Sequence, residues 1–177
     1  LGHNIQSYRH PAMVKEAIDF SVNVSRLPRY ASAAVPEDDS ALSPRIAVTI
    51  AITNKAGHPI PDGCPNVARL LLEVTAKSGN GSEIFFEEKS YMPIAQNDAR
   101  GDRMGRGPFE KNGMIIDTSL LPLTTTQERY DIPVSDNEKE AEVTVRLTYL
   151  PFGTLKRSDS PTLWREEVRK ISLQDGE

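Results

Sequence analysis

The chain has 177 residues, a net charge of −4 at pH 7, 38% hydrophobic residues and 26% charged residues. This length suffices for one domain with its own hydrophobic core, and the composition is that of an ordinary globular domain. The acidic balance argues against a nucleic-acid-binding protein, because neutralising phosphates requires a basic surface. No apolar run approaches the about 20 residues of a membrane-spanning helix, so we expect no membrane span.

The first predicted elements are a lead-in and a short helix. Residues 1–12 indicate an extended lead-in, and residues 12–17 consist of helix formers. Further along, apolar side chains recur at every second position, which is typical of half-buried strands. These predicted strands cover residues 17–25, 45–52, 68–76, 114–118, 126–134 and 141–150, and another strand starts at Ile84.

Loops separate several of these strands. The turn signal Ser78-Gly79-Asn80-Gly81 predicts that residues 68–88 form a hairpin. Residues 28–44 contain three prolines and predict a loop, whereas residues 95–113 lack periodicity and predict a long excursion without strands.

The C-terminal part leaves two alternatives open. Residues 160–170 can start a helix with Ser160 as its N-cap, or a last strand can lie near residues 168–173.

Seven or more short strands with Pro- and Gly-containing turns and little helix predict an all-β antiparallel sandwich. A parallel α/β fold would need helices between its strands, and the sequence lacks them. We place the sandwich domain at residues 17–177 and treat residues 1–16 as a lead-in from an upstream region. The chain begins at Leu1 rather than Met, so we expect it to be part of a longer protein.

The cysteine content limits the chemistry. Cys64 is the single cysteine, so it cannot form an internal disulfide, and it fits a buried structural residue better than a nucleophile. No C-x-x-C-H motif is present, so the chain has no covalent haem attachment site of its own. The sequence predicts no catalytic residues and no metal site.

The most informative motif is the hallmark loop, residues 53–63 (T-N-K-A-G-H-P-I-P-D-G), which joins two predicted strands. We expect Gly57 and Gly63 to supply backbone angles that other residues resist, while the prolines, including Pro61, stiffen the path. His58 is interpreted as a loop residue whose ring bonds a backbone group. One alternative is that His58 faces a haem or a partner; another is a metal site with Cys64, although two donors are too few for zinc.

This loop and the strand after it resemble the haem-free β-sandwich domain that closes many bacterial multihaem c-type cytochromes. That family shows V-T-N-x-x-x-G-H-x-x-P-x-G followed by R-x-x-L-E-V-x-A. A second stretch of the chain follows the family order D-T-x-L-x-P … A-x-V-x-V-x-L-x-Y. The matching residues are Ile52-Thr53-Asn54, Gly57-His58, Pro61, Gly63, Arg69, Leu72-Glu73-Val74 and Ala76, then Ile116-Asp117-Thr118, Leu121-Pro122-Leu123 and residues 141–149.

The resemblance implies an immunoglobulin-like or fibronectin-like sandwich without catalytic activity. It implies that the parent protein carries haem c, that this domain caps or docks the haem-bearing domain or a redox partner protein, and that it supports electron transfer. It also implies a periplasmic or cell-surface location. His3, and after it His10, become candidate distal haem ligands, with solvent-exposed terminal histidines as the alternative.

Two other functions compete with this interpretation. A carbohydrate-binding or adhesion module would show an exposed aromatic strip, although core packing explains Tyr91, Tyr149, Phe152 and Trp164 better. A metal-dependent enzyme would need converging His, Asp or Cys side chains. The cytochrome interpretation instead predicts an apolar patch or a haem-facing loop near His58 or the N-terminus.

Overall fold

The computed structural model of the chain describes residues 9–27, 44–61, 68–97, 111–151, 155 and 161–174. In this part, one short helix, α1 (Pro11–Ala17), is followed by nine strands. The strands are β1 (Ile18–Leu27), β2 (Arg45–Asn54), β3 (Arg69–Ser78), β4 (Glu83–Tyr91), β5 (Pro93–Asn97), β6 (Lys111–Asp117), β7 (Thr124–Pro133), β8 (Glu140–Leu150) and β9 (Thr162–Ser172).

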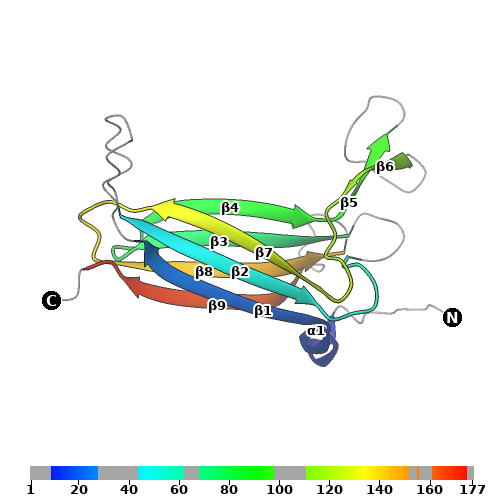
Figure 1. Ribbon diagram of the computed structural model, residues 1–177, viewed down its shortest axis with the longest axis horizontal. Coiled ribbons are helices and arrows are strands. Elements are labelled where there is room, and N and C mark those ends of the chain that lie inside the picture. The colour runs from blue at the N-terminus through cyan, green and yellow to red at the C-terminus, as the bar shows by residue number, and fades with distance from the viewer. Residues whose placement is uncertain are drawn as a thin grey trace.

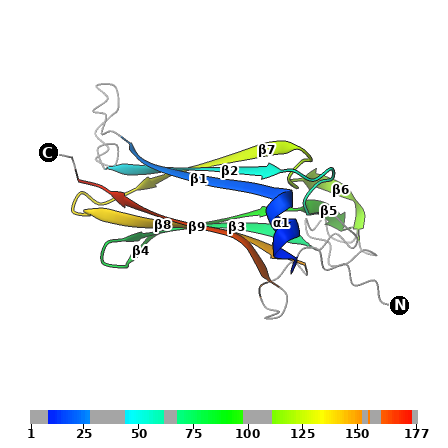
Figure 2. The same ribbon diagram turned by 90° about the horizontal axis from the view of Figure 1, so that it is seen from below.

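Two antiparallel sheets lie face to face as a sandwich, which Figure 2 shows from the edge. One sheet has the strand order β1-β2-β7, and the other has the order β4-β3-β8-β9. β5 and β6 pair as a separate hairpin that projects from one end of the sandwich (Figure 1). The prediction of an all-β antiparallel sandwich with little helix is confirmed.

The core lies between the sheets and takes every second residue of each central strand. On β2 these residues are Ile46, Val48, Ile50 and Ile52, all fully buried. Each such side chain contributes about 1.5–3 kcal/mol when it leaves water. Because side chains alternate between the two faces, a slip of one residue would expose the whole set, so burial fixes the register. The facing sheet supplies the fully buried residues Leu70, Leu72, Val74, Val143, Val145 and Leu147.

β1 confirms the alternation that its sequence predicts. Ile18 and Val22 are buried in the core, and Phe20 and Val24 are partly buried against it. The residues between them point outward, as the burial pattern of the strand shows.

Of the two alternatives for the C-terminal part, the helix at residues 160–170 is wrong and the last strand is confirmed, because β9 lies there, paired antiparallel with β8, and begins earlier than residue 168. Its register sets Arg165 and Glu167 opposite the core residues Leu147 and Val145 of β8, so two partly buried charged side chains lie on the inward face of this edge strand. Pairing with β8 overrides a locally helical sequence. The inward charges also discourage pairing with another chain at this edge. Ser160 lies outside the described residues.

The predicted excursion at residues 95–113 is wrong at both of its ends. β5 and β6 occupy Pro93–Asn97 and Lys111–Asp117, and the register between them shifts twice. Such irregular pairing leaves no clear period-two signal in the sequence. The predicted strand at residues 114–118 corresponds to the second half of β6. The loop predicted at residues 28–44 lies outside the described residues except for Pro44.

The motifs of the sequence meet at one end of the sandwich, which we call the loop end. Here β1 begins opposite Asn54, the last residue of β2, and β7 begins at Thr124. The loop end also carries α1, the hallmark loop and the β5–β6 hairpin (Figure 1). The opposite end carries the turn between β3 and β4 and the connection between β7 and β8.

Candidate functional site at the loop end

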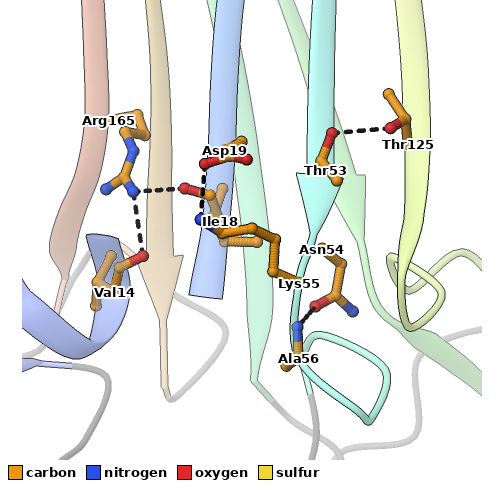
Figure 3. A network of polar contacts seen from close by, with 9 residues as sticks. All are labelled: Val14, Ile18, Asp19, Thr53, Asn54, Lys55, Ala56, Thr125 and Arg165. Atoms are coloured by element: carbon orange, nitrogen blue, oxygen red, sulfur yellow. Dashed lines mark hydrogen bonds and ion pairs between the residues drawn. The ribbon is translucent and has the colours of Figure 1, made fainter. Parts of the chain in front are cut away.

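Asn54 organises the hallmark loop. Its side chain is fully buried at the end of β2. The Nδ2 group donates to the carbonyl oxygens of His58 and Leu120, each at 2.9 Å. The Oδ1 atom accepts a hydrogen bond from the backbone N–H of Ala56 at 2.9 Å (Figure 3). Because a buried amide is costly unless its groups are paired, these three bonds fix the start of the loop and join it to the segment before β7.

The second half of the loop is fastened to the same segment. The backbone N–H of Ile60 donates to the carbonyl of Leu120 at 3.0 Å, and that of Leu120 donates back at 2.7 Å. Both side chains are buried in the core. Pro61 follows through a cis peptide bond and is also buried. The described part of the loop is therefore a rigid and packed structure.

Two of the three histidines, His58 and His10, lie at or near this end. His58 is exposed, and its Nδ1 atom lies 3.0 Å from the carbonyl oxygen of Pro59. His10 is exposed at the start of α1, where its carbonyl accepts a bond from the backbone N–H of Val14 and its ring makes no capping bond. His3, Gly63 and Cys64 lie outside the described residues.

The expected conformational role of Gly57 is wrong. Gly57 is exposed, its φ lies outside the left-handed region, and a Cβ built on it would meet no atom within 4 Å. Another residue would therefore fit this position. The loop is shaped by the hydrogen bonds of Asn54 and not by the freedom of this glycine.

Arg165 joins β9 to the start of the chain. Its Nη2 atom donates to the carbonyl oxygens of Val14 at 3.1 Å and Ile18 at 2.6 Å (Figure 3). Nearby, Lys55 forms a 2.9 Å ion pair with Asp19, and its backbone N–H donates to the carbonyl of α1's last residue. These contacts hold α1 against the sandwich beside the hallmark loop. They also frame a groove of about 600 Å³ between α1 and the start of β9.

A second polar cluster joins the edge strands β4 and β7 across the sandwich. The Nζ atom of Lys89 lies 2.7 Å from Oε1 of Glu128, and the hydroxyl of Tyr91 donates to the same oxygen at 2.9 Å. Burial, and then the Glu128 charge, raises the pKa of Tyr91 above its ordinary value. The same causes raise the pKa of Tyr130 to about 12. The phenol groups of both tyrosines therefore stay protonated, and in this form the cluster stabilises the packing of the two sheets.

The described residues hold no group of three or more His, Cys, Asp and Glu side chains that is suited to a metal ion. Within the described part, none of the helices is long and apolar enough to cross a membrane. Of the candidate aromatics, Tyr91 and Tyr149 are buried, and Trp164 stacks on Tyr149 with ring centroids 4.9 Å apart. Core packing is confirmed for these residues, and Phe152 lies outside the described part.

Sequence reasoning named Asn54 only as part of a match and missed Arg165. The signal for Asn54 was an amide side chain at the end of an apolar strand, directly before turn residues. At such positions the Asn side-chain oxygen accepts a hydrogen bond from the backbone N–H two residues later. The signal for Arg165 was absent, because its partners are backbone carbonyls about 150 residues away in sequence.

Comparisons with known proteins place this fold. No family model matches the chain, and no curated protein matches it. It superposes on the crystal structure of a penta-haem cytochrome c552 from Thermochromatium tepidum with a TM-score of 0.64 and 21% identity. The match covers 92% of this chain and 42% of that chain, so this chain spans less than half of the cytochrome's length. The two proteins therefore share a fold over that region.

Two further solved structures are more distant. A structural genomics target, SoR45, has a TM-score of 0.43 and 12% identity, covering 91% of this chain and 92% of that one. A beta-galactosidase from Bacteroides fragilis has a TM-score of 0.40 and 14% identity, covering 86% of this chain and 16% of that one. No argument rests on either.

Proposed function

We propose that this chain is the haem-free β-sandwich domain of a multihaem c-type cytochrome, where it supports electron transfer by docking against the haem-bearing part or a redox partner. The observation that carries the proposal is the superposition of 92% of this chain on 42% of a penta-haem cytochrome. The superposed region is less than half of a longer haem protein, so a chain of this fold can be one part of a multihaem cytochrome.

The sequence motif supports the same proposal independently. The residues that resemble the cytochrome family include Asn54 and Pro61, and both are buried where the hallmark loop is fastened to the core. The motif therefore corresponds to a structural joint at the loop end. A joint of this kind suits a surface that must present fixed residues to a neighbouring domain.

The strand order supports an immunoglobulin-like interpretation of the sandwich. β1, β2 and β7 would correspond to strands A, B and E, whereas β3, β8 and β9 would correspond to C, F and G, with β4 beside C. The β5–β6 hairpin is then an insertion before strand E.

The histidines have proposed roles that follow from this function. His58 is exposed at the loop end and is proposed to contact the partner surface. His3 remains the first proposed distal haem ligand and His10 the second, because neutral imidazole binds haem iron. The domain itself is proposed to be non-catalytic. A periplasmic or cell-surface location is proposed because this family attaches its haem outside the cytoplasm.

A carbohydrate-binding module is the competing function, and the described surface does not favour it. Such a module would present several aromatic rings on one face. Among the described residues one aromatic side chain, Phe86, is exposed.

The reading frame upstream of Leu1 tests the proposed function. We expect several C-x-x-C-H motifs and a signal peptide upstream, because covalent haem attachment requires the two cysteines and the histidine. A start codon at or near Leu1 without such motifs would remove the basis of the proposal.

A further inference from the structure

Exposed apolar side chains gather at the loop end. The described residues include eight large apolar side chains that are exposed, and six of them lie at this end. The other two, Phe86 and Val168, lie on the outer face of the four-stranded sheet. A single exposed apolar residue needs no explanation, but a concentration at one end indicates an interaction surface. The six are Met13, Ile116, Leu121, Leu123, Leu155 and Leu163.

Leu123 has both an unfavourable exposure to water and an unfavourable backbone conformation. Its side chain is 75% exposed, and its φ of 54° places a leucine in the left-handed region. That conformation costs an L-residue about 1–2 kcal/mol. Its neighbour Leu121 is 57% exposed. The strain of Leu123 and the exposure of both leucines gain nothing in water, so this segment points to a surface that becomes covered.

The groove beside α1 adds a local positive charge. Four cationic side chains line it, against the two carboxylates of Glu16 and Asp19. The chain as a whole carries a net charge of −4, so this excess is local. The apolar residues Val14, Leu163 and Trp164 line the same groove. A groove that is both apolar and cationic is complementary to a flat apolar group that bears carboxylates, which is the chemistry of a haem edge with its propionates.

The start of the described chain lies at the same place. α1 begins at Pro11 at the loop end, so the polypeptide that leads into the domain enters there (Figure 1). The sequence-remote Arg165 holds this helix in position. A region that precedes the domain in the same polypeptide would therefore be joined to it at the loop end.

We infer that the loop end, with the Leu121–Leu123 segment and the groove beside α1, is the surface on which the haem-bearing region of the same polypeptide docks through a haem edge. This inference rests on the proposed function, and it names the partner and the residues that contact it. Leu121 and Leu123 supply apolar contact, and Lys15 at the groove faces the haem carboxylates.

Thiol labelling of the full-length protein tests this surface. The variants Leu121→Cys, Leu123→Cys, Phe86→Cys and Val168→Cys are made in a Cys64→Ser background, and labelling rates are compared under native conditions. Exposure within the domain alone predicts that Leu123→Cys, at 75%, reacts faster than Phe86→Cys, at 49%. Docking reverses this order, so we expect Leu121→Cys and Leu123→Cys to react several-fold more slowly than both control variants. Equal melting temperatures confirm that the variants are folded.

A charge variant tests the haem-edge chemistry. In the full-length protein, we expect Lys15→Glu to raise the labelling rate of Leu123→Cys, because it places a carboxylate beside the haem carboxylates. Lys139→Glu, at the opposite end, is the matched control and should leave that rate unchanged.

The outcomes separate the inference from the proposed function. A haem-containing protein in which Leu123→Cys labels faster than Phe86→Cys would overturn the docking surface and leave the proposed function standing. Slow labelling of Leu123→Cys that Lys15→Glu does not change would overturn the haem-edge contact. A full-length protein without haem would overturn both.

Discussion

Replacing Asn54 by alanine tests the role of this residue as the organiser of the loop end. The change removes two donated bonds and one accepted bond, each 2.9 Å long, from a fully buried site. The carbonyl of Leu120 keeps its bond from Ile60, so the unpaired groups are mainly those of Ala56 and His58. At about 0.5–1.5 kcal/mol for each bond, with a further cost for buried unpaired groups, we expect a loss of about 3 kcal/mol in the free energy of unfolding.

Urea unfolding of the purified chain measures this loss. The midpoint should fall while the m value stays constant, because the surface exposed on unfolding is nearly unchanged. Asn23→Ala is the matched control, since Asn23 is exposed on β1, and it should change stability by less than about 0.5 kcal/mol. Asn54→Asp keeps the acceptor but loses both donated bonds, so it should be destabilised as well. A loss for Asn54→Ala as small as that of the control would refute the reasoning.

Three further predictions concern other parts of the sandwich. Leu123→Asn should raise the free energy of unfolding of the purified chain by about 0.5–1 kcal/mol, because Asn tolerates the left-handed region. The urea midpoint should rise accordingly, and a lower midpoint would contradict this. Arg165→Met should accelerate amide exchange in α1, whereas Arg169→Met, which removes a surface ion pair, should not; equal effects would argue against the anchoring role. Burial beside Glu128 raises the pKa of Tyr91, so the unfolded state loses its phenolic proton first. The Tyr91 hydroxyl should therefore leave the free energy of unfolding unchanged below about pH 10 and lower it at higher pH. Tyr91→Phe should reduce that fall. A free energy of unfolding that rises above about pH 10 would contradict the raised pKa of Tyr91.

The sequence predicts the central strands of the sandwich well, because burial and alternation coincide there. In β2, for example, Ile46 to Ile52 alternate without interruption, and each inward side chain is fully buried. Edge strands lack this coincidence. β9 turns Arg165 and Glu167 inward at the margin of the sandwich, where Arg165 bonds a backbone carbonyl and Glu167 pairs with Arg169. Its sequence therefore lacks a clear alternation and left a helix and a strand as alternatives.

The site is less predictable than the core. The hallmark motif pointed to a loop that is fastened to the core, and its role in binding stays a prediction. Exposed apolar residues such as Met13 and Leu163 lie near the start of the described chain. The emphasis on glycine conformation was wrong at Gly57, because one buried amide can shape a loop without a left-handed residue. Contacts between segments about 150 residues apart, such as those of Arg165, follow only from the packing of the sheets.

The covalent haem content of the full-length protein tests the central claim most directly. The protein would be purified from its native source, and covalently bound haem per polypeptide would be measured by mass spectrometry and by the reduced absorption spectrum. The proposed function predicts several covalent haems on each polypeptide, all outside residues 1–177, since these residues contain no C-x-x-C-H motif. A polypeptide that contains this domain but no covalent haem would contradict the claim.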